Sequence, residues 1–223
     1  MFKNRLENAC VKRTVAAVVP AYNEAETICE VVGVLQGVAD IDEIIVVNDG
    51  STDETANKAA EMGVRIINLY PNRGKGGAMK AGVQATAAEI ILFIDADLVG
   101  LSEEHCRKLL EPVLREQADM TVGLFSGGRT TTTLAQKVAP FLSGQRAVRR
   151  EIIECVPELE ESRYGVEVAI SRYASTNSFR VEKITLHDVS QVMKEEKQGF
   201  MTGAKNRFLM YWEIIKVLKP TKR

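Results

Sequence analysis

Two carboxylates, Asp95 and Asp97, stand on either side of one small residue at the end of an apolar run. The run, residues 89–94, has the length and the β-branched and aromatic content of a buried strand. A strand with this ending brings both carboxylates to the carboxyl edge of a sheet, where open α/β folds bind ligands. Their oxygens suit Mg²⁺ or Mn²⁺, ions that also coordinate phosphate oxygens. An isolated pair of this kind could also be a solvated turn that caps the next helix. The segments that precede it in the sequence must therefore distinguish a binding site from a capping turn.

Short apolar runs alternate with helical periodicity through the first half of the chain. This alternation predicts an α/β fold with a mostly parallel sheet and right-handed crossovers. Strands are expected at 14–19, 44–47, 64–69, 89–94 and 120–124, and helices at 24–36, 53–62, 77–88 and after Ser102. Further on, the pattern predicts helices at 145–155 and 166–174, a strand near 179–184 and a long final helix.

Composition narrows the class of protein. The chain has 223 residues, enough for one domain, and its 29 Lys and Arg nearly balance 30 Asp and Glu, so no nucleic-acid partner is expected. Four widely spaced cysteines without a CxxC pair indicate free thiols in a reducing compartment. The charged first seven residues are unlike a signal peptide, and no apolar stretch reaches the roughly 18–20 residues of a membrane span. We expect a cytoplasmic protein, or one bound peripherally at the inner face of a membrane.

Polar clusters follow three of the predicted strands. They are residues 20–24, 48–53 and 95–97, and parallel strands would bring all three to one edge of the sheet. Each cluster alone could be helix-cap chemistry. Three acidic strand ends together are unfavourable without a cation or a ligand rich in donors, which predicts a binding site.

These segments carry a resemblance to a known family. Val-Pro-Ala-Tyr-Asn-Glu at 19–24, Val-Val-Asn-Asp-Gly-Ser-Thr-Asp at 46–53 and Asp-Ala-Asp at 95–97 resemble, in order and spacing, the family 2 glycosyltransferases of the GT-A fold. Similar members include polyprenyl-phosphate glycosyltransferases and glucosyl-3-phosphoglycerate synthases. The resemblance implies a Rossmann-like GT-A domain over 1–223, with helices on both faces of the sheet. Residues of about 14–118 would form the nucleotide-sugar-binding half, and about 119–223 the acceptor half.

The resemblance also implies an activity and residue roles. A hexose would pass from a UDP- or GDP-linked sugar to an acceptor with the help of Mg²⁺ or Mn²⁺. Asp49 would accept a hydrogen bond from the base, Asp97 would bind the metal, and Asp95 would contact ribose or a metal-bound water. The other residues expected to line the nucleotide sugar are Pro20, Ala21, Tyr22, Glu24 and Ala96.

A glycine-rich segment, residues 72–78, contains Lys75 and precedes a predicted helix. Glycines there let backbone N–H groups approach an anion, and Lys75 adds a positive charge. The segment lacks the ending of a Walker A loop, and a flexible turn with a solvated lysine is the alternative. The similar families also contain this Gly-Lys-Gly stretch, so we expect Lys75 to contact the diphosphate and to stabilise the leaving group catalytically.

The second half is expected to bind the acceptor. Arg146, Arg149 and Arg150 would share one face of the predicted 145–155 helix and, with Gly144, clamp a phosphate; a solvated basic face is the alternative. Glu167 resembles a glutamate that contacts the sugar or the acceptor in the same families, unless it only begins a helix. The acidic base motif of many inverting members is missing here. An anionic phosphate acceptor needs no such base, so we expect polyprenyl phosphate or a small phosphorylated acid.

Two features near the end of the chain complete the predictions. His187 follows a predicted strand, and by resemblance it would be a third metal ligand beside Asp95 and Asp97, although a lone histidine is often structural. Residues 200–218 combine aromatic, aliphatic and basic side chains. They predict a helix that contacts a membrane surface, packs on the domain or joins a second subunit in a homodimer. The basic aromatic tail favours a lipid-linked acceptor.

A second class of function stays open at this point. The chain could be a non-catalytic nucleotide-sugar-binding module or a sugar nucleotidyltransferase on a related sheet. The intact Asp95 and Asp97 pair favours a transferase over a degenerate binding protein. Nucleotidyltransferases usually carry a glycine-rich loop directly after the first strand, and residues 20–23 do not fit one.

Overall fold

The computed structural model describes residues 13–126, 143–157, 159 and 165–192. Its larger sheet consists of β1 (Val15–Ala21), β2 (Glu43–Asn48), β3 (Arg65–Asn68), β4 (Ile90–Phe93), β6 (Met120–Ser126), β7 (Arg146–Arg149) and β8 (Val181–His187). A two-stranded sheet pairs β5 (Leu98–Val99) with β9 (Ser190–Gln191). The helices are α1 (Ile28–Gln36), α2 (Thr55–Glu61), α3 (Gly74–Gln84), α4 (Glu103–Leu114), α6 (Arg150–Glu154) and α7 (Val166–Thr176).

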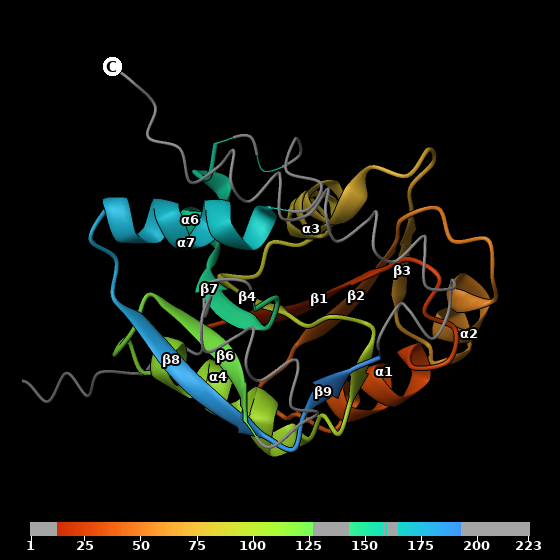
Figure 1. Ribbon diagram of the computed structural model, residues 1–223, viewed down its shortest axis with the longest axis horizontal. Helices are drawn as coiled ribbons and strands as arrows, with labels where there is room; N and C mark the ends of the chain where they lie inside the picture. The colour runs from red at the N-terminus through yellow and green to blue at the C-terminus, as the bar shows by residue number, and fades with distance from the viewer. Residues whose placement is uncertain (1–12, 127–142, 158, 160–164, 193–223) are drawn as a thin grey trace, which may run out of the picture.

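The strand order in the larger sheet is β3-β2-β1-β4-β7-β6-β8. Neighbours among β1 to β4 pair in parallel, as do β6 and β8, whereas β7 is antiparallel to both β4 and β6. Helices α3, α6 and α7 lie on one side of this sheet, and α1 and α4 on the other (Figure 1). The predicted α/β fold, with a mostly parallel sheet and helices on both faces, is confirmed.

The core has two layers, one on each face of the sheet. One cluster packs β1 and β4 against α1 and α4, and the other packs β1, β2 and β4 against α3, α6 and α7. Every residue from Val15 to Val19 and from Ile90 to Phe93 is at most 1% exposed. Burial on both faces explains why these strands read as continuous apolar runs in the sequence.

The element boundaries depart from the predictions where long-range contacts decide them. Residues 145–149 were predicted to be helical, but Arg146–Arg149 form β7 and the helix begins only at Arg150. Strand β7 fills the gap between β4 and β6, and this pairing outweighs the helical spacing. Helix α3 begins at Gly74, three residues earlier than expected, and α1 begins at Ile28, four residues later.

Ion pairs join the strands of the second half. Asp119, directly before β6, accepts hydrogen bonds from Arg180 before β8 and lies 3.4 Å from Arg149 of β7. The hydrogen bonds from Arg180 lower the pKa of the Asp119 carboxyl to about 2, although burial opposes this. One carboxylate thus holds together the starts of β6 and β8 and the end of the antiparallel strand β7.

The predicted C-terminal helix at 200–218 lies outside the described residues. Among the helices that are described, none is both long and apolar enough to cross a bilayer.

Candidate active site

The loops that follow β1 and β2 are tied together at the carboxyl edge of the sheet. Ser51 Oγ accepts a hydrogen bond from the backbone N–H of Asn23 at 3.0 Å, and Asn23 Oδ1 accepts one from the backbone N–H of Thr52 at 2.8 Å. Thr55 Oγ1 accepts a third from the backbone N–H of Glu24 at 2.8 Å. These cross-bonds hold two of the three predicted polar clusters side by side.

Asp49 fastens the end of β2 to the beginning of α3. Its Oδ1 accepts a hydrogen bond from the backbone N–H of Arg73 at 2.7 Å, while Asn72 Nδ2 donates to the Asp49 carbonyl at 2.7 Å. The residue is only 4% exposed. The carboxylate that was predicted to bind a base therefore also has a structural partner, through one of its two oxygens.

Lys75, in the first turn of α3, bridges two carboxylates from distant parts of the chain. Its Nζ lies 2.6 Å from Asp95 Oδ1 and 2.6 Å from Glu167 Oε1. Burial would lower the pKa of Lys75, but the charges of Asp95 and Glu167 and their hydrogen bonds outweigh burial and raise it above its ordinary value. Lys75 therefore keeps its positive charge, and it contacts both Glu167, predicted like itself to act in catalysis, and Asp95, predicted to line the nucleotide sugar.

Two glutamines complete the surroundings of Asp95. Gln145 Nε2 and Gln191 Nε2 both donate to Asp95 Oδ2, at 2.8 and 2.9 Å. Gln145 is itself oriented by Ser143 Oγ, which donates to its Oε1 at 2.9 Å. Asp95 is 8% exposed. Its two oxygens are contacted by side chains from α3, from the loop before β7 and from β9.

Arg146 lies fully buried beneath this cluster. Its guanidinium donates to the carbonyl oxygens of Ser143 and Glu167. Burial lowers the pKa of Arg146 while the charges of Glu167 and Asp95 raise it, but an arginine keeps its proton under all ordinary conditions. Arg146 thus fixes the backbone on both sides of the site.

The predicted clamp of three arginines is not formed. Because Arg146 and Arg149 lie in the strand β7, an odd spacing sends their side chains to opposite faces of the sheet. Arg149 pairs with Asp119, and Arg150 pairs with Glu154 and donates to the Thr86 carbonyl. The prediction that these side chains share a helix face was wrong because residues 146–149 are extended.

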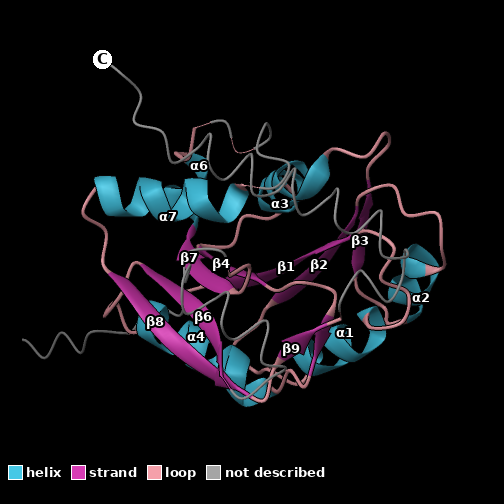
Figure 2. Cartoon of the chain, viewed as in Figure 1, coloured by secondary structure: helices cyan, strands magenta, loops and turns pink. Residues whose placement is uncertain are grey.

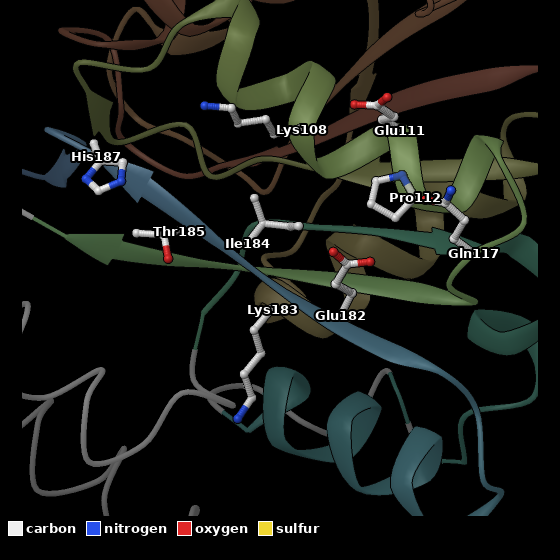
Figure 3. A pocket seen from close by; sticks show the side chains of 9 residues that line it. All are labelled: Lys108, Glu111, Pro112, Gln117, Glu182, Lys183, Ile184, Thr185 and His187. Carbon is white, nitrogen blue, oxygen red and sulfur yellow. The ribbon is translucent and has the colours of Figure 1, made fainter.

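The predicted metal trio is not assembled either. In the described part of the chain, no three His, Cys, Asp or Glu side chains are grouped to hold a metal ion. His187 instead lines a groove of about 460 Å³ between α4 and β8, with Lys108 and Glu111 near it (Figure 3). The predicted third ligand thus lies at the end of the edge strand β8 and is not grouped with Asp95 and Asp97.

The remaining predicted residues lie around the same edge. Thr27 Oγ1, at the start of α1, donates a hydrogen bond to the Ala96 carbonyl oxygen at 2.6 Å. This bond holds the Asp-Ala-Asp turn against α1. Pro20 is half-buried and Ala21 and Glu24 are buried, whereas Tyr22 is 41% exposed. Gly144 lies against Asp95 and Lys75. Sequence reasoning brought Asp95, Lys75, Glu167 and Gly144 to one site, and the structure places them in contact.

Sequence reasoning missed Gln145 and Gln191. Gln145 is next to the predicted Gly144. Because a helix was expected to begin there, the direction of the Gln145 side chain could not be inferred. Gln191 reaches the site through the pairing of β9 with β5, in which Leu98 lies opposite Gln191. No local pattern in the sequence predicts a two-residue strand of this kind.

Comparison with known proteins identifies the family. Residues 16–194 match the family model described as "Glycosyl transferase family 2", and the chain belongs to this family. It is 31% identical over 199 residues to the glucosyl-3-phosphoglycerate synthase of Mycolicibacterium smegmatis, an alignment with 74% of this chain and 65% of that protein. It is 26% identical over 210 residues to an undecaprenyl-phosphate 4-deoxy-4-formamido-L-arabinose transferase of Enterobacter, with 84% of this chain and 63% of the relative.

Solved structures show the same fold. The glucosyl-3-phosphoglycerate synthase of Mycobacterium tuberculosis, crystallised with Mn²⁺, UDP and phosphoglyceric acid, matches 92% of this chain and 77% of its own chain, with a TM-score of 0.74 and 25% identity. The predicted GT-A fold is confirmed. In the sequence alignments this chain spans slightly less than two thirds of the length of these relatives.

Gly144 offers a direct test of the cluster. A Cβ at this position would lie 2.4 Å from one Asp95 oxygen and 2.6 Å from both the other oxygen and Lys75 Nζ. Gly144→Ala should therefore force the ion pair apart and lower the free energy of unfolding by about 1–3 kcal/mol in urea denaturation.

Gly33→Ala is the matched control, because its Cβ would meet nothing nearer than 3.8 Å within α1. We expect this variant to be neutral or more stable by up to about 1 kcal/mol. A Gly144→Ala protein as stable as the wild type would show that the cluster is loosely held.

Proposed function

We propose that this chain transfers a hexose from a UDP- or GDP-linked sugar to a phosphorylated acceptor with the help of Mg²⁺ or Mn²⁺. The observation that carries the proposal is the ion cluster at the carboxyl edge of the sheet. In this cluster Lys75 lies within hydrogen-bond distance of both Asp95 and Glu167, and Asp97 follows Asp95 by two residues. The mycobacterial structure with UDP supports uracil as the base.

The charge of the cluster supports the need for a divalent ion. Lys75 and Arg146 balance Asp95 and Glu167, and Asp97 adds one further negative charge. A diphosphate that entered beside these carboxylates would meet like charge unless a cation came with it. The oxygen ligands available, from the carboxylates of Asp95 and Asp97 and the amide of Gln191, fit a hard ion such as Mg²⁺ or Mn²⁺. When bound, such an ion neutralises charge on the departing nucleoside diphosphate.

The residues of the chain would orient the reactants. Lys75 stands in the first turn of α3, where the helix dipole favours an anion. Held between the carboxylates, its ammonium would stabilise the negative charge that develops on the leaving group. Glu167, at the start of α7, would then contact a sugar hydroxyl or the acceptor. The fixed Asp95 would keep this arrangement rigid.

The acceptor is proposed from chemistry common to the relatives. Their names specify phosphoglycerate in one case and undecaprenyl phosphate in the other, so both carry a phosphate. A phosphate oxygen is already anionic near neutral pH and needs no strong base to attack the sugar. Acceptor contacts of Gly144, Arg146, Arg149 and Arg150 stay predictions, as do membrane contact through residues 200–218, a homodimer and a cytoplasmic location.

Loss of the Asp97 charge tests this function. The chain is incubated with UDP- and GDP-linked hexoses, Mn²⁺, and either 3-phosphoglycerate or a polyprenyl phosphate. We expect acceptor-dependent release of nucleoside diphosphate, reduced about 10²–10³-fold in Asp97→Asn because the site loses a carboxylate that would hold the divalent ion against the leaving group. Asp40→Asn, in the turn after α1 at the opposite edge, should retain full turnover.

The products separate the alternatives. Release of pyrophosphate would identify a nucleotidyltransferase, and sugar-nucleotide binding without any release would identify a binding module. Unchanged turnover in Asp97→Asn would contradict the metal role of Asp97.

Asp49→Asn separates the two roles of Asp49. Asparagine keeps an oxygen for the backbone N–H of Arg73 but replaces the other oxygen with a donor. If that other oxygen accepts a hydrogen bond from the base, UDP binding measured by calorimetry should weaken by about 1–3 kcal/mol, with little change in melting temperature. Equal affinity in both proteins would make Asp49 a turn residue only.

A further inference from the structure

Gln191 reaches the carboxylates of the site from the second sheet. Its strand β9 pairs antiparallel with β5, so that Gln191 lies opposite Leu98, the residue after Asp97. The backbone N–H of Val192 also donates to the Asp97 carbonyl at 3.0 Å. The backbone of Gln191 is therefore fixed beside Asp97 and does not depend on its side chain for this position.

The side chain of Gln191 joins the two carboxylates. Its Nε2 lies 2.9 Å from Asp95 Oδ2 and 3.4 Å from Asp97 Oδ1. A single amide thus touches both acidic residues that the sequence predicted as metal ligands. Rotation of the amide by half a turn exchanges Nε2 for Oε1 and converts the donor into a hard oxygen ligand.

The chain geometry explains why residue 191, and not residue 187, occupies this place. After His187 the backbone turns at Asp188, which has a φ of 58°. Gly100 allows this turn to approach closely, because a Cβ there would lie 2.4 Å from the Asp188 carbonyl oxygen. Val189 is then fully buried. The chain continues from β8 into β9 (Figure 2), which pairs with β5. His187 stays on the outer side of this turn, near His105.

We propose that Gln191 is the third protein ligand of the divalent ion, and that its amide oxygen binds the same ion as Asp97. This inference rests on the proposed function, because it assumes that a metal ion accompanies the nucleotide. Without the ion the amide donates to Asp95 and Asp97 and keeps their negative charges together. With the ion it presents Oε1.

The ligand type has a consequence for metal selectivity. A site of carboxylate and amide oxygens favours Mg²⁺ and Mn²⁺, whereas an imidazole ligand also suits Zn²⁺, Ni²⁺ and Cu²⁺. Metals that bind nitrogen strongly would thus be favoured less by Gln191 than by a histidine in its place. Replacing it with histidine should move the preference toward them while leaving Asp95 and Asp97 unchanged.

Binding and spectroscopy of Mn²⁺ in the presence of UDP test the proposal. Gln191→Leu should bind Mn²⁺ about tenfold or more weakly than the wild type, as judged by loss of the free-ion electron paramagnetic resonance signal. Gln191→His should show ¹⁴N coupling to the bound Mn²⁺ by pulsed resonance, and its affinity for Zn²⁺ relative to Mn²⁺ should rise at least tenfold. Gln36→His, on the far end of α1, is the control and should show neither change.

The outcomes separate this inference from the proposed function. If the wild type binds no Mn²⁺ with UDP or GDP, the metal-dependent transferase is refuted, and Gln191 has no ligand role. If the wild type binds Mn²⁺ but Gln191→Leu binds equally well and Gln191→His shows no ¹⁴N coupling, this inference alone is overturned. Melting temperatures without metal, including that of the smaller change Gln191→Asn, establish that the variants are folded.

Discussion

The two salt bridges of Lys75, to Asp95 and to Glu167, join three elements that are far apart in the chain. Lys75 lies in the first turn of α3, Asp95 follows β4, and Glu167 lies in the first turn of α7. The ion pairs thereby connect the first half of the chain to the second half at the site, in addition to the pairing of β4 with β7. The contacts that neutralise these charges also constrain the start of α7 relative to the start of α3.

Neutrality is maintained by a small set of neighbours. Gln145 and Gln191 satisfy Asp95, Arg146 holds the backbone on either side, and Gly144 leaves just enough room for the ion pair. Buried charges of this kind are tolerated only when each is paired and hydrogen-bonded. The proposed function therefore requires that an anionic ligand enter this site together with a cation.

Local sequence patterns predicted the parts of the site that local structure determines. Asp49, Asp95 and Asp97 follow buried strands, and Lys75 begins a helix, so the parallel sheet alone brings them to one edge. Strand β7 and the pairing of β9 with β5 are decided by long-range contacts, and helical spacing at 145–155 concealed the first of them. For this reason the arginine clamp and the role of His187 were predicted in the wrong geometry, and both glutamines were missed.

The central claim is that this cluster has no net positive charge to offer a diphosphate and therefore binds nucleotide only together with a divalent ion. Titration calorimetry of UDP and GDP into the wild-type chain, once with Mn²⁺ and once with EDTA, tests it most directly. The account predicts that the preferred nucleotide binds at least about tenfold more tightly with Mn²⁺, a difference of about 1.4 kcal/mol. Equal affinity in EDTA and in Mn²⁺ would contradict it.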